Sequence, residues 1–290
     1  MLRAIALHRT PGFNFPGHFL DLSYDRVTRD GARLSLATGA HCADADGQMN
    51  IGALALLADM ALAATLRGAV GASARLATVS MSLQFSGAPR VGPLHADASF
   101  DGFVAGTSEH QGLARVEVTS GRKLVCTGSG AFMVLGSSAP HPLPRRNSAR
   151  TVEAPPVDHL NAEEEAVYRR AREALEDRGP FLARFWGYAP VKRKGGATCT
   201  APNGMHVGNR VGHAQGGVTF GMAAVTAQAS LPQRWKLVAA SAWYVGPGTG
   251  ASLRARARIV HHGALTAVVH TRIEDEHQRG VLECVSSHAR

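Results

Sequence analysis

Residues Thr38 to Asp59, TGAHCADADGQMNIGALALLAD, decide the fold, because a similar stretch recurs later in the chain. The second copy runs from Asn203 to Ala224, NGMHVGNRVGHAQGGVTFGMAA, shifted by 165 positions without a gap. Five of the twenty-two positions are identical, and three of those are glycines, which mark backbone positions where a side chain would not fit. Each copy then runs into an apolar helix. The recurrence therefore predicts two similar halves.

The first of these helices is predicted over residues 51–66, IGALALLADMALAATL. Ala and Leu lie on every side of it, so no polar face is left for water and the helix is expected to be buried all round. Its sixteen residues are interrupted by Asp59, whereas a membrane span needs about 20 apolar residues. We therefore expect a core helix wrapped by a sheet.

Asp59 is the ionisable side chain inside this apolar helix. Moving a carboxylate out of water is costly unless the group is paired or hydrogen-bonded, so Asp59 is predicted to have a raised pKa or a chemical role. The structural alternative is an Asp held by backbone donors at a helix kink. Asp59 lies about 12 Å along the axis from Ile51, so it cannot reach the free N–H groups at the start of its own helix.

The second copy offers another helix start, Gln215-Gly216-Gly217. Two glycines at a helix N-terminus expose N–H groups and let a ligand approach closely. Antiparallel packing of the two central helices would bring Asp59 beside Gly216. The reciprocal contact would involve Ala224, which cannot perform acid–base chemistry, so we expect one complete site and one inactive counterpart.

These residues resemble the motif of the hotdog-fold acyl-CoA thioesterases of the phenylacetate-degradation type. That motif is an Asn, five residues, His-Gly-Gly, and an Asp seven residues after the last Gly. In the family, each site takes its Asp from one domain and its Asn and Gly N–H from the other. Here the first copy keeps the acid, Asp59, while the second keeps Asn209, Gly216 and Gly217, with Gln215 in the place of His.

The first copy has Asp44, Asn50 and Ile51 in the places of the Asn, the His and the first Gly. The defects of the two copies are therefore complementary, as in a tandem fusion that keeps one composite site. The family also places a Ser or Thr on the strand after the helix, and Thr78 is the nearest match in this sequence.

The resemblance implies an α+β fold of two tandem hotdog domains, each a long central helix wrapped by an antiparallel sheet, packed as a pseudo-dimer. The expected division is an N-terminal hotdog over residues 1–136, a Pro-rich linker and surface helix over 137–182, and a C-terminal hotdog over 183–290.

A hairpin over residues 21–39, with its turn at 29–31, precedes the first helix, and short strands follow both helices. One helix followed by a meander of strands is an α+β pattern. The later strands are predicted over residues 78–87, 94–104, 114–121, 123–134, 237–248, 251–263, 265–275 and 280–289.

The implied activity is hydrolysis of acyl-CoA thioesters at one site between the halves. Gly216 N–H, helped by Gln215, would bind the oxyanion. Asp59 would act as general base or as nucleophile, and Asn209 and Thr78 would position water and carboxylate.

Two alternatives stay open. A noncatalytic acyl-CoA-binding protein would bind without turnover. A hotdog hydratase or dehydratase acting on acyl thioesters would need an Asp and a His in one loop, for which His41 and Asp44 are the nearest pair.

Between the copies, residues 137–160 contain five prolines and are predicted to form a surface linker. Asn161 followed by Glu164 fits a capping box. The helix that begins there is predicted to be solvated and to stop at Gly179-Pro180.

The net charge of +9 and the pI near 10 allow a polyanionic partner. The sequence has no aromatic-flanked basic run and no recognition-helix signature, so the phosphates of coenzyme A are favoured over nucleic acid. Arg254, Arg256 and Arg258 alternate with alanines and so share one face of a strand. A solvated face is the simpler interpretation, and a phosphate-binding patch is the alternative.

The four cysteines, Cys42, Cys126, Cys199 and Cys284, lack CxxC or metal spacing and are expected to be buried apolar residues.

The histidines show no metal-binding spacing, so neither a metal nor a cofactor is expected. The recurring pair His41 and His206 is expected to flank strand ends. No apolar leader is evident, which favours a cytoplasmic location without membrane attachment. The resemblance suggests a homodimer paired through the sheets.

Overall fold

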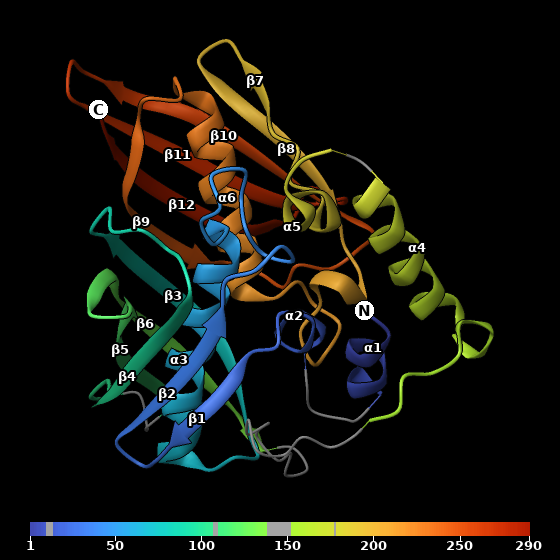
Figure 1. Ribbon diagram of the computed structural model, residues 1–290. Helices are drawn as coiled ribbons and strands as arrows, with labels where there is room; N and C mark the ends of the chain where they lie inside the picture. Colours follow the sequence, from blue (N-terminus) through green and yellow to red (C-terminus); the bar gives the residue numbers. More distant parts are fainter. Residues whose placement is uncertain (10–13, 107–109, 138–151, 177) are drawn as a thin grey trace.

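In the computed structural model, a twelve-stranded antiparallel sheet curves around two central helices (Figure 1). The structure describes residues 1–9, 14–106, 110–137, 152–176 and 178–290. The strand order is β1-β2-β4-β5-β6-β3-β9-β12-β11-β10-β8-β7. The second six strands repeat the first six in reverse order, so each half of the sheet has the same topology.

The first half contains one helix and six strands. They are β1 (Ser23–Val27), β2 (Gly31–Ala37), α3 (Ile51–Val70), β3 (Ala74–Phe85), β4 (Pro93–Phe103), β5 (Gln111–Ser120) and β6 (Lys123–Ser137). The second half has the same sequence of elements. They are β7 (Val191–Arg193), β8 (Gly196–Pro202), α6 (Gly216–Ser230), β9 (Lys236–Tyr244), β10 (Ser252–His262), β11 (Thr266–Asp275) and β12 (Gly280–Ala289), with a 3-10 turn at η2 (Met205–Val207). The predicted α+β class and strands are confirmed, whereas the short β7–β8 hairpin was not predicted.

The two copies found in the sequence have the same backbone geometry. Ala43 bridges Met49 in the first, and Gly208 bridges Ala214 in the second, 165 positions later. β8 likewise follows β2 by 165 positions at both ends. The loop glycine of each copy has a positive φ, +76° at Gly47 and +80° at Gly212, which explains why glycine recurs there.

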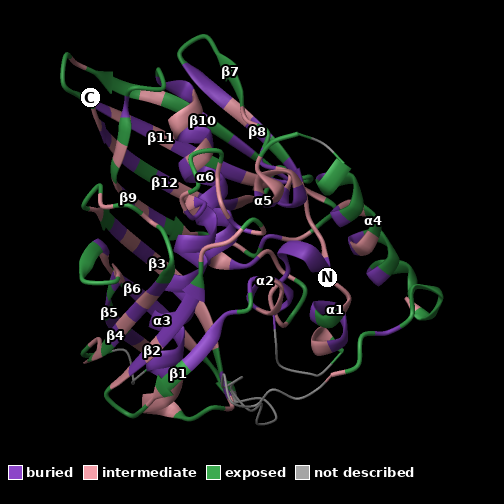
Figure 2. Cartoon of the chain, in the orientation of Figure 1, coloured by how far each residue is buried: buried purple, intermediate pink, exposed green. Residues whose placement is uncertain are grey.

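The helix α3 forms the core of the first half, and every residue from Gly52 to Leu66 is buried (Figure 2). Each fully buried Leu contributes about 1.5–3 kcal/mol. The helix runs four residues beyond the predicted end, and Gly68 in this extension allows the Thr28 carbonyl of the β1–β2 turn to pack against it. By length and composition α3 could cross a membrane, but 78% of its most apolar window is buried within the protein.

The two halves meet along a helix pair and a strand pair. The helices α3 and α6 run antiparallel, and their backbones approach closely. A side chain on Gly217 would collide with the backbone of Leu56, and one on Gly221 with that of Gly52. These two contacts are related by the same 165-position shift. In the sheet, β3 pairs with β9, and Ser82 donates a hydrogen bond of 2.9 Å to Ser241 across the junction.

The remaining helices pack on the open side of the two central helices (Figure 1). They are α1 (Leu2–His8), α2 (Phe15–Phe19), α4 (Ala162–Glu176) and α5 (Phe181–Trp186), with a 3-10 turn at η1 (Val157–His159). Phe15 and Phe19 of α2 pack against Phe185 of α5 with tilted rings, whose centroids are 6.4 and 4.9 Å from that of Phe185. The N-terminal segment thus contacts the second half.

The capping box at the start of α4 is confirmed, since Asn161 and Glu164 exchange two hydrogen bonds of 3.0 Å. The expectation of a solvated helix is only partly right. Glu164 is buried and pairs with Arg9 at 2.7 Å, and one face of α4 is covered. The helix ends at Glu176, before the predicted stop at Gly179. Prolines 140, 142 and 144 of the predicted linker lie outside the described residues.

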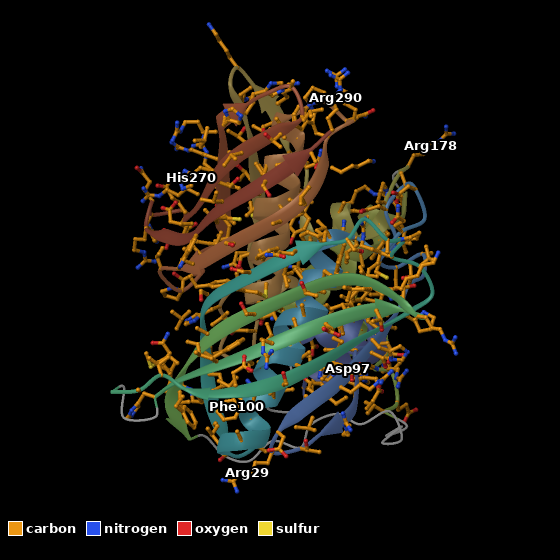
Figure 3. The ribbon with its side chains drawn as sticks, turned by 90° about the vertical axis from the view of Figure 1, so that its left-hand side faces the viewer. Arg29, Asp97, Phe100, Arg178, His270 and Arg290 are labelled. Atoms are coloured by element: carbon orange, nitrogen blue, oxygen red, sulfur yellow. The ribbon has the colours of Figure 1, made fainter. Side chains whose placement is uncertain are left out.

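The outer face of the sheet points away from the helices and carries partly exposed polar side chains such as Asp97 and His270 (Figure 3). Arg254, Arg256 and Arg258 are exposed on β10, as expected for a solvated face. All four cysteines are buried and unpaired, as predicted.

Candidate functional site

A cavity of about 450 Å³ opens where the two halves meet. One wall comes from α3 and β3 of the first half. The opposite wall comes from the loop before α6, the first turn of α6 and the segment after β9. Asp59 and Gly216 both line it, so the juxtaposition expected from antiparallel helix packing is present.

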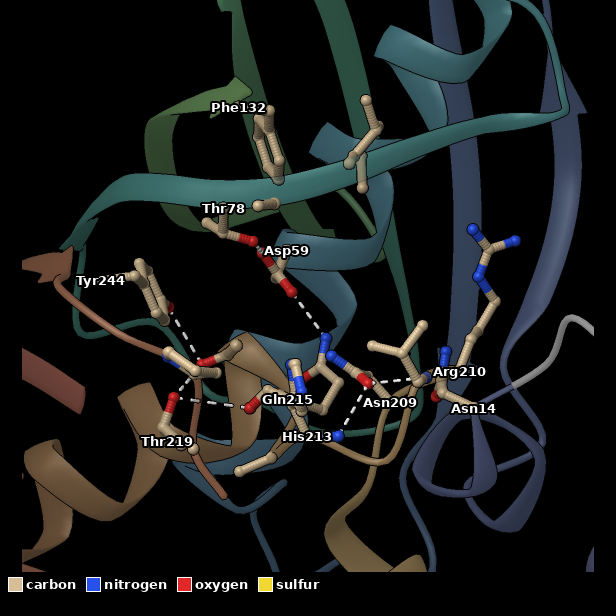
Figure 4. A pocket seen from close by; sticks show the side chains of 18 of the residues that line it. Asn14, Asp59, Thr78, Phe132, Asn209, Arg210, His213, Gln215, Thr219 and Tyr244 are labelled. Carbon is tan, nitrogen blue, oxygen red and sulfur yellow. Dashed lines mark hydrogen bonds between the residues drawn. The ribbon is translucent and has the colours of Figure 1, made fainter. Parts of the chain in front are cut away.

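Asp59 lies in the middle of α3 with 3% of its surface exposed. Thr78 on β3 donates a hydrogen bond of 3.1 Å to Oδ1, and Gln215 donates one of 2.6 Å from Nε2 to Oδ2 (Figure 4). The carboxyl therefore has one partner from each half of the chain. Burial, which disfavours the charged form, raises its pKa to about 6. The bonds from Thr78, Gln215 and the Gly217 backbone, with the charge of Arg67, oppose that rise.

Gln215 is the N-cap of α6. Its Oε1 accepts a hydrogen bond of 3.0 Å from Val218 N–H, while its Nε2 donates a hydrogen bond to Asp59. The carboxamide thus joins the start of α6 to the acid on α3. This is a different use from the oxyanion contact expected of Gln215, because both ends of the amide already have protein partners.

Gly216 is the first residue of α6 and leaves space in front of the acid. A Cβ at this position would lie 3.2 Å from Asp59 Oδ2 and 3.3 Å from Thr78 Oγ1. Among the described residues, none accepts a hydrogen bond from Gly216 N–H. Its carbonyl accepts hydrogen bonds of 2.9 Å from both Thr219 and Tyr244. These bonds fix the first turn, whose N–H groups and positive dipole end can stabilise a negatively charged oxygen.

Thr78 is aimed at Asp59 by an irregularity in β3. The register with β6 shifts between Thr78 and Ser80, opposite Phe132 and Ala131. Such bulges redirect a side chain out of the regular alternation of a strand. The sequence match to a Ser or Thr after the helix therefore falls at a residue that contacts the acid.

Asn209 lines the cavity but forms no hydrogen bond to Asp59 among the described residues. Its Oδ1 accepts hydrogen bonds from the backbone N–H groups of Val211 and His213, at 2.9 and 3.1 Å, which closes the loop before α6 (Figure 4). Asn209 thus lies at the site, as predicted from the sequence. Its side-chain oxygen orders the loop instead of contacting the Asp59 carboxylate.

On the opposite side of the helix pair, the place beside the start of α3 that corresponds to the cavity is filled by side chains. A side chain on Gly52 would meet the rings of Trp186 and Tyr188, at 2.9 and 3.2 Å. The position of the acid is taken by the buried Ala224. Asn50, the counterpart of Gln215, donates its hydrogen bond of 2.7 Å to Asp44 instead. This counterpart therefore has an alanine in place of the acid, and aromatic rings occupy the space beside Gly52.

Several cavity residues were not singled out in the sequence, among them Tyr24, Arg67, Arg210 and Tyr244. Tyr244 holds the Gly216 carbonyl, while Tyr24, Arg67 and Arg210 line the end of the cavity beyond Asp59. Arg67 was missed because the helix was predicted to end at Leu66, one residue earlier. Its spacing of eight residues from Asp59, close to two helical turns, could have identified it. Within the described parts of the chain, no group of three His, Cys, Asp or Glu residues could hold a metal ion.

Replacing Gln215 with alanine should lower the free energy of unfolding by about 0.5–2 kcal/mol, because α6 loses its N-cap. The pKa of Asp59 should also rise, since a donor to the charged form is removed. Urea unfolding and a ¹³C NMR titration of the Asp59 carboxyl measure the two effects. Asn50→Ala is the matched control: it should lower the stability similarly and leave the Asp59 pKa unchanged. An unchanged Asp59 pKa in both variants would contradict the role given to Gln215.

Comparison with known proteins supports a fold assignment. A family model described as the acyl-CoA thioesterase N-terminal domain matches residues 207–289. The tesB protein of Mycobacterium avium subspecies paratuberculosis is 14% identical, with 93% of this chain and 96% of that chain covered and a TM-score of 0.56. Acyl-CoA thioesterase II TesB2 of Mycobacterium marinum is 12% identical, with 94% and 95% covered and a TM-score of 0.53.

A conserved protein with a hot dog fold from Alicyclobacillus acidocaldarius is 12% identical, with 93% and 95% covered and a TM-score of 0.53. No curated protein matches the chain. These solved structures share the fold of the chain over nearly its whole length. The resemblance to hotdog-fold thioesterases expected from the sequence is therefore confirmed.

Proposed function

We propose that this chain, which has the hotdog fold and matches an acyl-CoA thioesterase domain over residues 207–289, hydrolyses acyl-CoA thioesters to free acid and CoA. The observation that carries the proposal is the buried carboxyl of Asp59 beside the first turn of α6, with both lining one cavity. A base and oxyanion donors that line the same space are what acyl transfer to water requires.

The reaction needs only polarisation of the carbonyl and delivery of water, because a thioester carbonyl has little resonance stabilisation and a thiolate leaves readily. In the proposed reaction Gly216 N–H donates to the carbonyl oxygen. Asp59 removes a proton from water as the water oxygen bonds to the carbonyl carbon. The tetrahedral intermediate then collapses, the C–S bond breaks, and the CoA thiolate takes up the proton that Asp59 had removed from water. Thr78 and Gln215 hold the carboxylate in place, and Asn209 orders the loop that precedes the donors.

Asp59 could instead attack the carbonyl itself and form an anhydride that water hydrolyses. Single turnover in H₂¹⁸O with excess enzyme separates the two routes. If water attacks the Asp59 carbonyl of the anhydride, the first turnover leaves ¹⁸O in the Asp59 carboxyl and unlabelled oxygen in the released acid. A general base instead puts ¹⁸O into the released acid and leaves the Asp59 carboxyl unlabelled.

We also infer that the two hotdog units, residues 1–136 and 183–290, arose by tandem duplication and pack as a pseudo-dimer with one composite site. The shared backbone geometry at the 165-position shift supports this, as does the reversed order of the two sets of strands. Residues 137–182 are the proposed connector.

A panel of acyl-CoA substrates with a thiol-reactive dye tests the proposed activity. Release of free CoA that depends on Asp59 supports hydrolysis. Binding of acyl-CoA by calorimetry without thiol release would instead indicate the noncatalytic alternative. The hydratase alternative has less support: Asp44 is bonded to Asn50, while the His41 ring packs edge-on against Phe19.

The pH dependence of kcat/KM should report the ionisation of Asp59. Its pKa of about 6 means that the carboxylate forms as pH rises through that value, so kcat/KM should increase between about pH 5 and 7 and then level off. Thr78→Val removes a donor to the charged form and should move the inflection to higher pH. A profile that is flat from pH 5 to 8, or one that Thr78→Val leaves in place, would exclude Asp59 as the titrating base.

We further propose a cytoplasmic homodimer that pairs through the outer faces of the sheets. Trp243 and Val285 are 49% and 41% exposed on neighbouring strands near the middle of the sheet, which supports this face as the contact. Light scattering of the wild type and of Trp243→Lys tests it: a monomeric wild type would exclude the dimer.

A further inference from the structure

Three arginines line one end of the cavity. Arg67 lies in the last turn of α3, Arg75 near the start of β3, and Arg210 in the loop before α6. Figure 4 shows Arg210 and Tyr244 on opposite sides of the cavity, with Asp59 and Gln215 between them. All three line the same cavity, and burial together with the charges of the nearby Arg67 and Arg75 lowers the pKa of Arg210.

None of the three arginines forms an ion pair with an acid in the described parts of the chain. The hydrogen bond of Arg67 is a long one, 3.5 Å from Nε to the Ala74 carbonyl. Arg67 and Arg210 are half-buried, and a cation removed from water without a counter-ion is costly, whereas Arg75 is exposed. Tyr24 lies at the same end, is 95% buried (5% exposed), and keeps its proton because burial raises its pKa to about 12. This end of the cavity is therefore suited to an anion.

The position of Arg67 along α3 limits which anion fits. Asp59, Met60, Ala63 and Arg67 all line the cavity, so it runs along one face of the helix. Eight residues correspond to about 12 Å of helix, and helical side chains tilt toward the N-terminus, which brings the guanidinium closer to Asp59. The pantetheine arm of CoA, extended at roughly 3.5 Å per three bonds, separates sulfur from diphosphate by about 15 Å. The diphosphate would extend past the arginines, whereas a carboxylate on an acyl chain of about six to eight carbons would reach them.

We infer that the proposed thioesterase acts on acyl-CoA substrates whose acyl chain ends in a carboxylate, held by Arg67, Arg75 and Arg210. The inference rests on the proposed function, in which the thioester carbonyl lies between Asp59 and Gly216. It adds a substrate class: the CoA monothioesters of dicarboxylic acids.

The test compares kcat/KM for adipyl-CoA with hexanoyl-CoA, and for suberyl-CoA with octanoyl-CoA. The wild type should prefer the carboxylated member of each pair by about tenfold or more, since a charge-assisted hydrogen bond is lost with the neutral chain. Arg210→Gln and Arg67→Gln should each reduce that preference about tenfold. Because the charge of Arg67 also lowers the pKa of Asp59, the readout is the ratio of the two rates within each pair of substrates. Arg254→Gln, which removes an exposed charge on β10, is the matched control and should leave both rates unchanged.

Three other results of these measurements would each lead to a different conclusion. A wild type that hydrolyses hexanoyl-CoA as well as adipyl-CoA would overturn the inference and leave the proposed function standing. Arginine variants that lose rate equally on both CoA substrates, but lose none on N-acetylcysteamine thioesters, would assign the arginines to the CoA phosphates and also overturn it. If no thioester is hydrolysed, the proposed function fails, and calorimetry then tests the anion site. Tighter binding of adipyl-CoA than of hexanoyl-CoA, with the difference abolished in Arg210→Gln, supports the anion site. Equal binding of the two overturns it.

Discussion

Asp59→Asn is expected to lower kcat for acyl-CoA hydrolysis by about 10² to 10⁴-fold, the usual contribution of a positioned general base. The loss should be at the upper end or beyond if the carboxylate is the nucleophile. The fold should survive, because asparagine has the same shape and its Oδ1 can still accept the hydrogen bond from Gln215 or Thr78. Steady-state kinetics and a thermal melt measure the two quantities.

The matched control for this variant is Asp44→Asn. Asp44 belongs to the corresponding loop of the first copy and is bonded to Asn50 on the opposite side of the helix pair. Its replacement should change kcat by less than about twofold. Equal losses in the Asp44 and Asp59 variants would show that the activity depends on general stability rather than on one acid.

Gly216→Ala is expected to lower kcat/KM by about 10²-fold, in the range seen when an oxyanion donor is lost. The added methyl group would lie 3.2 Å from Asp59 Oδ2 and 3.3 Å from Thr78 Oγ1, in the space proposed for the thioester carbonyl. Stability should not decrease much, because alanine is favourable within a helix and these contacts are tight but not overlapping. Kinetics and urea unfolding of the same preparation separate the two effects.

Ile51→Ala provides the comparison at the corresponding helix start of the first half. It alters the same structural position without touching the cavity, so activity should be retained. If Gly216→Ala hydrolyses acyl-CoA at the wild-type rate, the first turn of α6 is not where the carbonyl binds.

Much of the fold was predictable because the sequence repeats it. Both copies combine a positive-φ glycine, a loop bridge and an N-cap, which are local features that depend on a few neighbouring residues. The contact between Asp59 and the start of α6 also followed, since antiparallel packing of two buried helices determines which residues are opposite.

The remaining features depend on contacts between distant parts of the chain. Trp186 and Tyr188 fill the counterpart of the site, although they lie more than 130 positions from Gly52, and no local pattern indicates this. The role of Gln215 was also not predictable, because an amide at a helix start can bind a ligand or a neighbouring carboxyl, and only the 2.6 Å distance to Asp59 decides. The buried face of α4 likewise depends on the pairing of Glu164 with Arg9.

The most direct test of the composite site is a crystal structure of Asp59→Asn bound to a hydrolysable acyl-CoA. We expect the thioester oxygen to accept a hydrogen bond from Gly216 N–H, with the carbonyl carbon facing residue 59. An acyl group bound away from the α3–α6 contact, or one whose carbonyl meets groups from only one half of the chain, would contradict it.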